Sequence, residues 1–201
     1  MRIMLRALVA CLTLTASLVF AADPLVITRG ADRAIPVAVV PFGWNGSAML
    51  PEDPARIISN DLYNSGFFRP VAREHMISMP ARPDEIIYRD WRAVGAQYLL
   101  IGDAAAQPDG RIQISYHLFN VTSEEQLYSG TVTGTGQQLR DLAHHIADQA
   151  HEKVTGIKGA FSTRLLFVTA SGPVNDRRYS LYRADYDGAR AVTLLQSREP
   201  I

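Results

Sequence analysis

Three side chains with the chemistry of metal ligands share one side of a predicted helix. His144, Asp148 and His151 follow one another at spacings that bring them to nearly the same direction around an α-helix, so a metal ion could contact two of them. They also lie opposite the apolar positions of that helix, where a solvent-facing surface is polar in any case. We therefore expect a solvated helix face here and no functional metal.

The other candidates for chemistry have no partners that the sequence identifies. His117 alternates with apolar residues, and His75 lies in a predicted loop. Gly134-Thr135-Gly136 lacks the further glycine and lysine of a phosphate-binding loop, and Glu124-Glu125 sits at a predicted turn, where both side chains should be solvated. The sequence contains neither a Gly-x-Ser-x-Gly elbow nor a His-Glu-x-x-His pair. We expect a protein without catalytic activity and without a cofactor.

The elements that must position these residues begin after a segment with the features of a secretory signal peptide. In residues 1–21, two arginines precede an apolar run from Ala7 to Phe20, and small residues around Ala21 and Ala22 fit a cleavage site between them. The run is shorter than the about 20 apolar residues that cross a bilayer. We expect export of a soluble protein that begins at Ala22.

Composition narrows the classes of function further. The 201 residues include 20 Lys and Arg, 20 Asp and Glu, and one cysteine, Cys11, which lies within the predicted signal peptide. Cleavage would leave a slightly acidic chain without cysteine. Such a chain has no disulfide, no cysteine-ligated metal and no thiol nucleophile, and its charge does not suit a nucleic-acid surface.

Residues 35–156 predict a single α/β domain with a mixed sheet. Asp53 is placed to cap a helix that Gly66 would end in a left-handed conformation. Interleaved strands and helices with short loops are typical of one mixed-sheet unit. The predicted strands are 35–42, 67–72, 98–102, 112–118 and 127–133, and the predicted helices are 51–64, 84–94 and 139–154.

Residues 157–201 predict a different architecture. Three short strands, 164–170, 180–185 and 191–195, are joined without a helix, and Asp187-Gly188 predicts a hairpin turn between the last two. This pattern is similar to part of one β-propeller blade, which needs neighbours to bury its faces. We expect these residues to be the first, incomplete blade of a truncated β-propeller.

The segment from Ala22 to Ala34 has a short apolar stretch, Leu25-Val26-Ile27, between polar flanks. It could be a tail, an edge strand of its own domain, or a strand that is offered to a partner's sheet.

Three stretches together resemble the TolB family of the Tol–Pal system. The first is Val-Val-Pro-Phe at 39–42 with Pro-Glu-Asp at 51–53, Ile-Ile at 57–58, Asp-Leu at 61–62 and Ser-Gly-x-Phe-x-Pro at 65–70. The second is Trp-x-x-x-Gly-Ala at 91–96. The third is Thr-Gly-Ile-Lys-Gly-Ala-Phe-x-Thr-Arg at 155–164, with Asp-Tyr-Asp-Gly at 185–188. The third is the most specific, because it marks the family's junction between an α/β domain and a propeller.

The resemblance implies a periplasmic protein without enzymatic activity, built from an α/β domain and a six-bladed propeller. It implies binding of TolA through the mature N-terminus and of Pal through the propeller. It also implies roles in outer-membrane integrity, in constriction during cell division and in colicin import. Since most of the propeller is missing from this sequence, the resemblance assigns no Pal-binding residue.

By the same resemblance, the TolA-binding arm comprises Ala22, Asp23, Pro24, Leu25, Val26, Ile27, Thr28, Arg29, Gly30, Ala31, Asp32 and Arg33. The alternatives are a periplasmic hydrolase whose catalytic domain is truncated, and a solute-binding module with a propeller.

Overall fold

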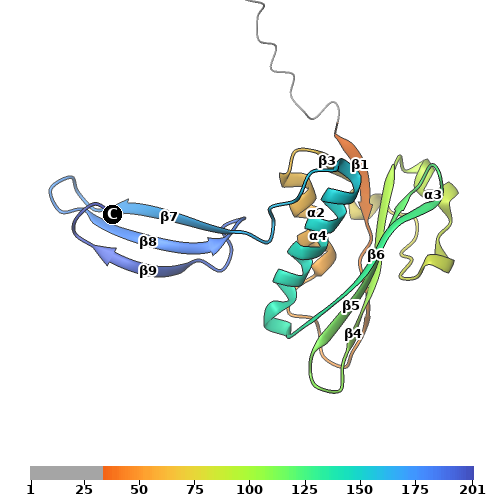
Figure 1. Cartoon of the computed structure of the whole chain (residues 1–201), viewed down its shortest axis with the longest axis horizontal. Helices are drawn as coiled ribbons and strands as arrows, with labels where there is room; N and C mark the ends of the chain where they lie inside the picture. Colours follow the sequence, from red (N-terminus) through yellow and green to blue (C-terminus); the bar gives the residue numbers. More distant parts are fainter. Residues whose placement is uncertain (1–33) are drawn as a thin grey trace, which may run out of the picture.

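A mixed β-sheet in the order β3-β1-β4-β5-β6 forms the centre of the α/β domain in a computed structural model that describes residues 34–201 (Figure 1). The predicted signal peptide and the arm residues 22–33 lie outside the described residues. β1 runs parallel to β3 and β4, β2 also pairs with β4 in parallel, and β4, β5 and β6 are antiparallel. The strands are β1 (Ile35–Val39), β2 (Gly43–Asn45), β3 (Phe68–Pro70), β4 (Tyr98–Ala106), β5 (Ile112–Asn120) and β6 (Glu125–Gly134).

Helices cover both faces of this sheet. α2 (Pro54–Asn64) and α4 (Leu139–Thr155) pack together on one face, and α3 (Tyr88–Ala93) packs on the other. The two faces hold separate cores, so β4 buries Leu100 on the α2–α4 side and Leu99 and Ile101 on the α3 side. This confirms the prediction of a mixed-sheet α/β domain. Short helical turns occur at η2 (Arg73–His75), η3 (Pro83–Glu85) and η4 (Gly136–Gln138).

The predicted cap and left-handed end of α2 are confirmed by their local geometry. The Asp53 carboxylate accepts hydrogen bonds from the backbone N–H groups of Ala55 (3.0 Å) and Arg56 (3.3 Å), which caps the first turn of α2. Gly66 and Gly156 follow α2 and α4 with φ of 75° and 73°, a left-handed conformation in which a Cβ atom is strained.

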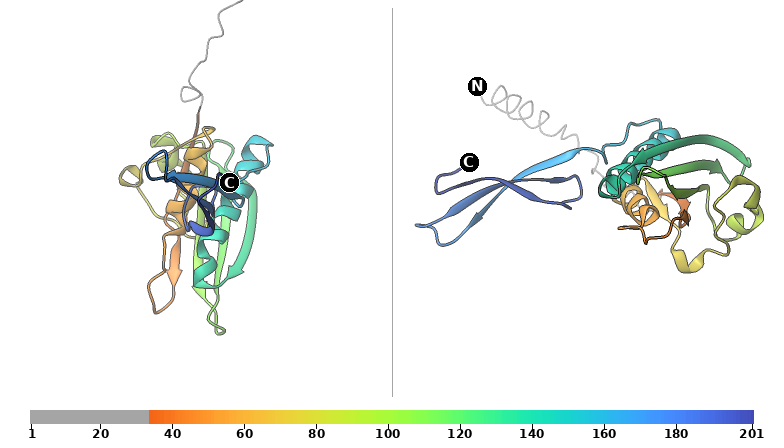
Figure 2. Two further views of the ribbon diagram at one scale, coloured as in Figure 1. Left: turned by 90° about the vertical axis from the view of Figure 1, so that its left-hand side faces the viewer. Right: turned by 90° about the horizontal axis from the view of Figure 1, so that it is seen from below.

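The C-terminal sheet contains β7 (Arg164–Ser171), β8 (Arg178–Asp185) and β9 (Val192–Ser197), paired antiparallel in chain order. The predicted hairpin turn is present, with Gly188 at φ 84°. Figure 1 and the right-hand view of Figure 2 show this sheet extending away from the α/β domain, with the β8–β9 turn as the end nearest α4. Its three antiparallel strands are consistent with the start of a propeller blade. Apolar side chains such as Leu166 and Leu194 are exposed on it.

Every helix within residues 34–201 is too short or too polar to span a bilayer.

Candidate functional site

The junction between the α/β domain and the C-terminal sheet is built around a buried acid–histidine pair. Asp61 on α2 and His144 on α4 are 1% and 0% exposed, and His144 Nδ1 lies 2.7 Å from Asp61 Oδ2. Tyr186, at the β8–β9 turn, donates from its hydroxyl to Asp61 Oδ1 over 2.7 Å, and its ring packs edge-on against His144. The prediction that His144 lies on a solvated face is therefore wrong.

His151 is buried as well, which corrects the second part of that prediction. It is 4% exposed, its Nδ1 lies 2.9 Å from the carbonyl oxygen of Ile157, and its ring contacts Phe67, Phe68 and Phe161 edge-on. After Gly156 the chain turns back across this side of α4. Ile157 and Phe161 therefore cover the helix face that the sequence predicts to be exposed to solvent.

Asp148, the remaining member of the predicted set, fixes the connection to the C-terminal sheet. Its carboxylate accepts hydrogen bonds from the backbone N–H groups of Phe161 (2.8 Å) and Ser162 (3.1 Å). Gly159 passes so close that a Cβ atom there would clash with the Asp148 carboxylate. His144, Asp148 and His151 thus have separate structural partners, and the structure does not bring them together as a ligand set.

A different set, Asp61, His144 and Asp187, has one potential ligand atom each within 4.8 Å of the others. Both carboxylates already have partners, because Asp61 binds His144 Nδ1 and Tyr186, and Asp187 accepts a hydrogen bond from the Arg140 guanidinium. His144 Nε2 is buried without a hydrogen-bond partner within residues 34–201. A cation would have to displace that guanidinium. The arrangement is therefore a hydrogen-bonded contact between two parts of the chain.

Ion pairs surround this buried contact. Asp185 is 2% exposed and lies within 3.5 Å of guanidinium nitrogens of Arg140, Arg164 and Arg190. Asp141 on α4 pairs with Arg164, at the start of β7, over 2.7 Å, and with Arg190, in the β8–β9 turn. Hydrogen bonds from Arg190 and then Arg164 lower the pKa of Asp141, and hydrogen bonds to Asp141 and Asp185 raise the pKa of Arg190.

The lowered pKa of Asp141 predicts a specific loss of stability in acid. Because the pKa in the folded chain lies below the ordinary value of about 4, the stabilisation is complete at neutral pH. It is lost as the pH falls below about 4 and through the folded-state pKa. We expect Asp141→Asn to lower the free energy of unfolding at pH 7 and to make it depend less on pH below about 4.

Urea unfolding between pH 3 and pH 7 measures both effects. Asp176→Asn, in the exposed β7–β8 turn, is the control, and an acid profile for Asp141→Asn parallel to that of the unchanged chain would contradict the assignment.

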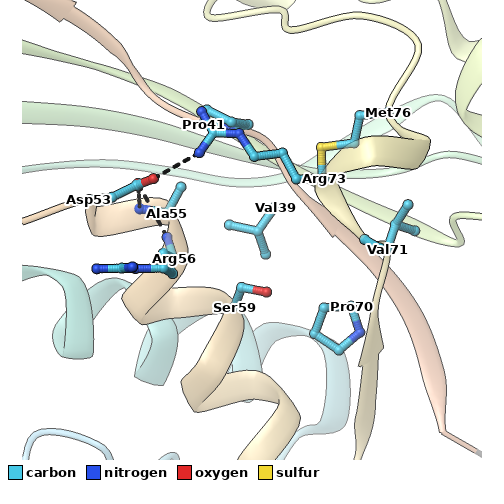
Figure 3. Close-up of a pocket in the computed structure, with 11 residues that line it drawn as sticks. Val39, Pro41, Asp53, Ala55, Arg56, Ser59, Pro70, Val71, Arg73 and Met76 are labelled. Carbon is cyan, nitrogen blue, oxygen red and sulfur yellow. Dashed lines mark hydrogen bonds and ion pairs between the residues drawn. The ribbon is translucent and has the colours of Figure 1, made fainter.

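A groove of about 240 Å³ lies at the carboxyl ends of β1 and β3, beside the first turns of α2 (Figure 3). Val39, Pro41, Val71 and Met76 supply much of its apolar lining. The Asp53 carboxylate on its rim caps α2 and accepts a hydrogen bond from Arg73 over 3.1 Å. The sequence did not predict this groove, and its rim carboxylate is already engaged in structural contacts.

The other polar residues that the sequence singles out lie apart from the junction. His117 on β5 contacts Gln126 at 3.2 Å, and His75 lies in η2. Gly134 ends β6 and packs against Gln138 and Leu142. The expectation for Glu124 needs correction, because this half-exposed side chain pairs with Arg92 at 2.8 Å instead of being simply solvated.

Sequence reasoning named Asp61 within the family motif but assigned it no role at the junction. Asp61 shares the apolar face of α2 with Ile57, Ile58 and Leu62, and all four are buried. An acidic residue within the apolar stripe of a helix is a usable signal, because a buried carboxylate must have partners.

Comparisons with known proteins place this geometry in a family. The model of the TolB amino-terminal domain matches residues 24–127. The Tol-Pal system protein TolB of Pseudomonas syringae is 57% identical over 198 residues, which are 98% of this chain and 46% of that protein. The corresponding protein of Pseudomonas aeruginosa is 56% identical over 202 residues, with 100% and 46% covered. The chain spans about half the length of these curated relatives.

A solved structure agrees with the sequence comparisons. The crystal structure of TolB from Acinetobacter baumannii matches with a TM-score of 0.71 at 30% identity, over 84% of this chain and 40% of that one. The match covers more of the chain than the α/β domain alone contains. On the family match and this shared structure, the chain belongs to the TolB family.

Proposed function

We propose that this chain is a periplasmic component of the Tol–Pal system and acts as an adaptor without catalytic activity. It binds TolA through residues Ala22–Arg33, and full-length relatives bind Pal through the propeller. The adaptor supports outer-membrane integrity and constriction during cell division, and colicin import uses it. The observation that carries the proposal is the family match, which begins at residue 24 and so includes most of the proposed arm.

The proposal assigns a role to each segment of the chain. Residues 1–21 direct export and are removed, 22–34 form the arm, 35–156 form the α/β domain, and 157–201 begin the propeller. The arm leads into β1, where the Ile35 N–H donates to the carbonyl oxygen of Phe67 over 2.8 Å. A firmly held strand therefore directly follows the proposed arm.

Strand addition to a sheet of TolA is the mechanism that suits such a segment. Main-chain hydrogen bonds supply affinity in this mode of recognition, and alternate side chains set the register. Leu25, Val26 and Ile27 would provide those side chains. The mechanism needs a short apolar strand near a free terminus, and removal of the signal peptide creates that terminus.

Deleting residues 22–33 tests the proposal. We expect the affinity for TolA to fall at least about a hundredfold, because the deletion removes the whole added strand. The melting temperature of the α/β domain should be nearly unchanged, since its described core lies within residues 35–161. Isothermal titration calorimetry with purified TolA and a thermal melt provide the two measurements.

A matched control replaces the same twelve positions with a glycine–serine linker of equal length. This variant should lose TolA binding as the deletion does, which separates strand recognition from the length of the terminus. Unaltered TolA affinity in either variant would refute the proposal.

A further inference from the structure

Tyr186 reaches from the β8–β9 turn to Asp61 on α2 and His144 on α4. Its ring lies edge-on to His144, with centroids 5.4 Å apart, and at 5.4 Å from the ring of Phe161. Its hydroxyl donates to Asp61 Oδ1 over 2.7 Å, and burial with the nearby Asp61 carboxylate raises the pKa of Tyr186, so the hydroxyl keeps its proton. One side chain of the C-terminal sheet thus takes part in a buried polar contact of the α/β domain.

The hydroxyl of Tyr186 satisfies an acceptor that little else can reach. Asp61 Oδ2 is bound to His144, and among residues 34–201 the hydrogen-bond partner of Oδ1 is Tyr186. A buried carboxylate oxygen without a donor is costly, so Asp61 favours the seated position of Tyr186. The structure shows Tyr186 seated on Asp61. A withdrawn Tyr186 would leave Asp61 Oδ1 to be hydrated by water instead.

The segment that joins α4 to β7 is held in place by contacts other than those of Tyr186. Asp148 holds the backbone N–H groups of Phe161 and Ser162, and His151 contacts the carbonyl oxygen of Ile157. These contacts fix the chain to α4 up to residue 162, and Thr163 donates from its N–H (3.2 Å) and its hydroxyl (2.6 Å) to the carbonyl oxygen of Ala160. Because β7 begins at Arg164, a rotation of the sheet as a unit would be concentrated between Thr163 and Arg164.

Ion pairs also hold the β8–β9 turn against α4. Arg140 contacts Asp185 and Asp187, and Arg190 contacts Asp185 and Asp141. The Arg140 and Asp185 side chains are mostly buried, whereas the Arg190 and Asp141 side chains are each 37% exposed, so salt screens the second pair more strongly. The hydrogen bond of Tyr186 is buried, short and directional, so it restricts the orientation of the sheet together with these pairs.

We propose that Tyr186, Asp61 and His144 form a latch that sets the orientation of the C-terminal sheet on the α/β domain. Withdrawal of Tyr186 lets the sheet swing about the bond between residues 163 and 164 while both parts stay folded. Tyr186 and Asp61 act as positioning residues, and His144 holds Asp61 in the orientation that receives the hydroxyl. This role is independent of the proposed TolA arm.

Tyr186→Phe removes the hydroxyl and keeps the ring, and Tyr182→Phe on β8 is the matched control. Spin labels on cysteines at Ser129→Cys and Asn175→Cys, both exposed and one on each part, report the orientation in a chain that also carries Cys11→Ser. We expect Tyr186→Phe to raise the ratio of swung to latched molecules about tenfold, as the loss of one hydrogen bond to a charged group predicts. A distance distribution equal to that of Tyr182→Phe would overturn the proposal.

A double-mutant cycle with Asp61→Asn tests whether the effect passes through the carboxylate. In the Asp61→Asn background, Tyr186→Phe should change the ratio less than twofold. A full effect in that background would overturn the latch, because Tyr186 would then act through other contacts. Urea unfolding followed by tryptophan fluorescence completes the test. If Tyr186→Phe shifted the unfolding midpoint of the α/β domain as much as Asp61→Asn does, Tyr186 would be an ordinary core residue and the proposal would fail.

Discussion

Replacing Asp61 by alanine is expected to lower the free energy of unfolding of the α/β domain by about 3–5 kcal/mol, the range for removing one member of a buried pair. The substitution leaves His144 Nδ1 and the Tyr186 hydroxyl without the carboxylate that each contacts at 2.7 Å. Both tryptophans of the chain, Trp44 and Trp91, lie in the α/β domain. Urea titration followed by their fluorescence therefore measures the loss.

Asp84→Ala is the matched control, because Asp84 is an aspartate of the same domain whose side chain is 75% exposed. Its surface pairing with Arg82 at 3.5 Å is worth at most about 1 kcal/mol, so little change is expected. If Asp61→Ala were as mild as Asp84→Ala, the Asp61–His144 pair would contribute little to the fold. The latch would then lack the stable acceptor on which it depends.

Helix caps, turn glycines and apolar periodicity predicted the α/β domain well, because residues close together in sequence specify its elements. The cap at Asp53, the left-handed Gly66 and the apolar stripe of α2 are all visible within about a dozen positions of sequence. β2 was missed because its three residues, Gly43–Asn45, show no alternation. Pairing with Asp103–Ala105 of β4, far away in sequence, makes it a strand.

The junction could not be predicted in the same way. Helical periodicity gives α4 one buried side, the side that faces the sheet, and it assigns His144 and His151 to water. In the structure α4 packs against the sheet, α2 and the returning segment around Phe161, so it is buried over most of its circumference. No local pattern reveals that Tyr186 meets Asp61, because these residues come from different parts of the chain.

The second core, on the α3 side of the sheet, contains Trp91, its largest fully buried side chain. Trp91 is 1% exposed and packs among residues such as Leu99, Ile101 and Phe119. Trp91→Ala is expected to lower the free energy of unfolding by about 3–5 kcal/mol, since the surrounding strands cannot collapse into the space that is left. Urea unfolding followed by far-ultraviolet circular dichroism measures this effect without relying on the tryptophan that is removed.

Trp91→Phe separates the two contributions of this side chain. Trp91 Nε1 is buried without a hydrogen-bond partner within residues 34–201, so phenylalanine removes an unpaired donor while it keeps part of the ring volume. Relief of that unpaired donor is worth about 1–3 kcal/mol and offsets part of the lost packing. Trp91→Phe should therefore cost clearly less than half of what Trp91→Ala costs. Equal losses in the two variants would mean that Nε1 has a partner in solution, such as a water molecule, and that the indole is held by hydrogen bonding as well as by packing.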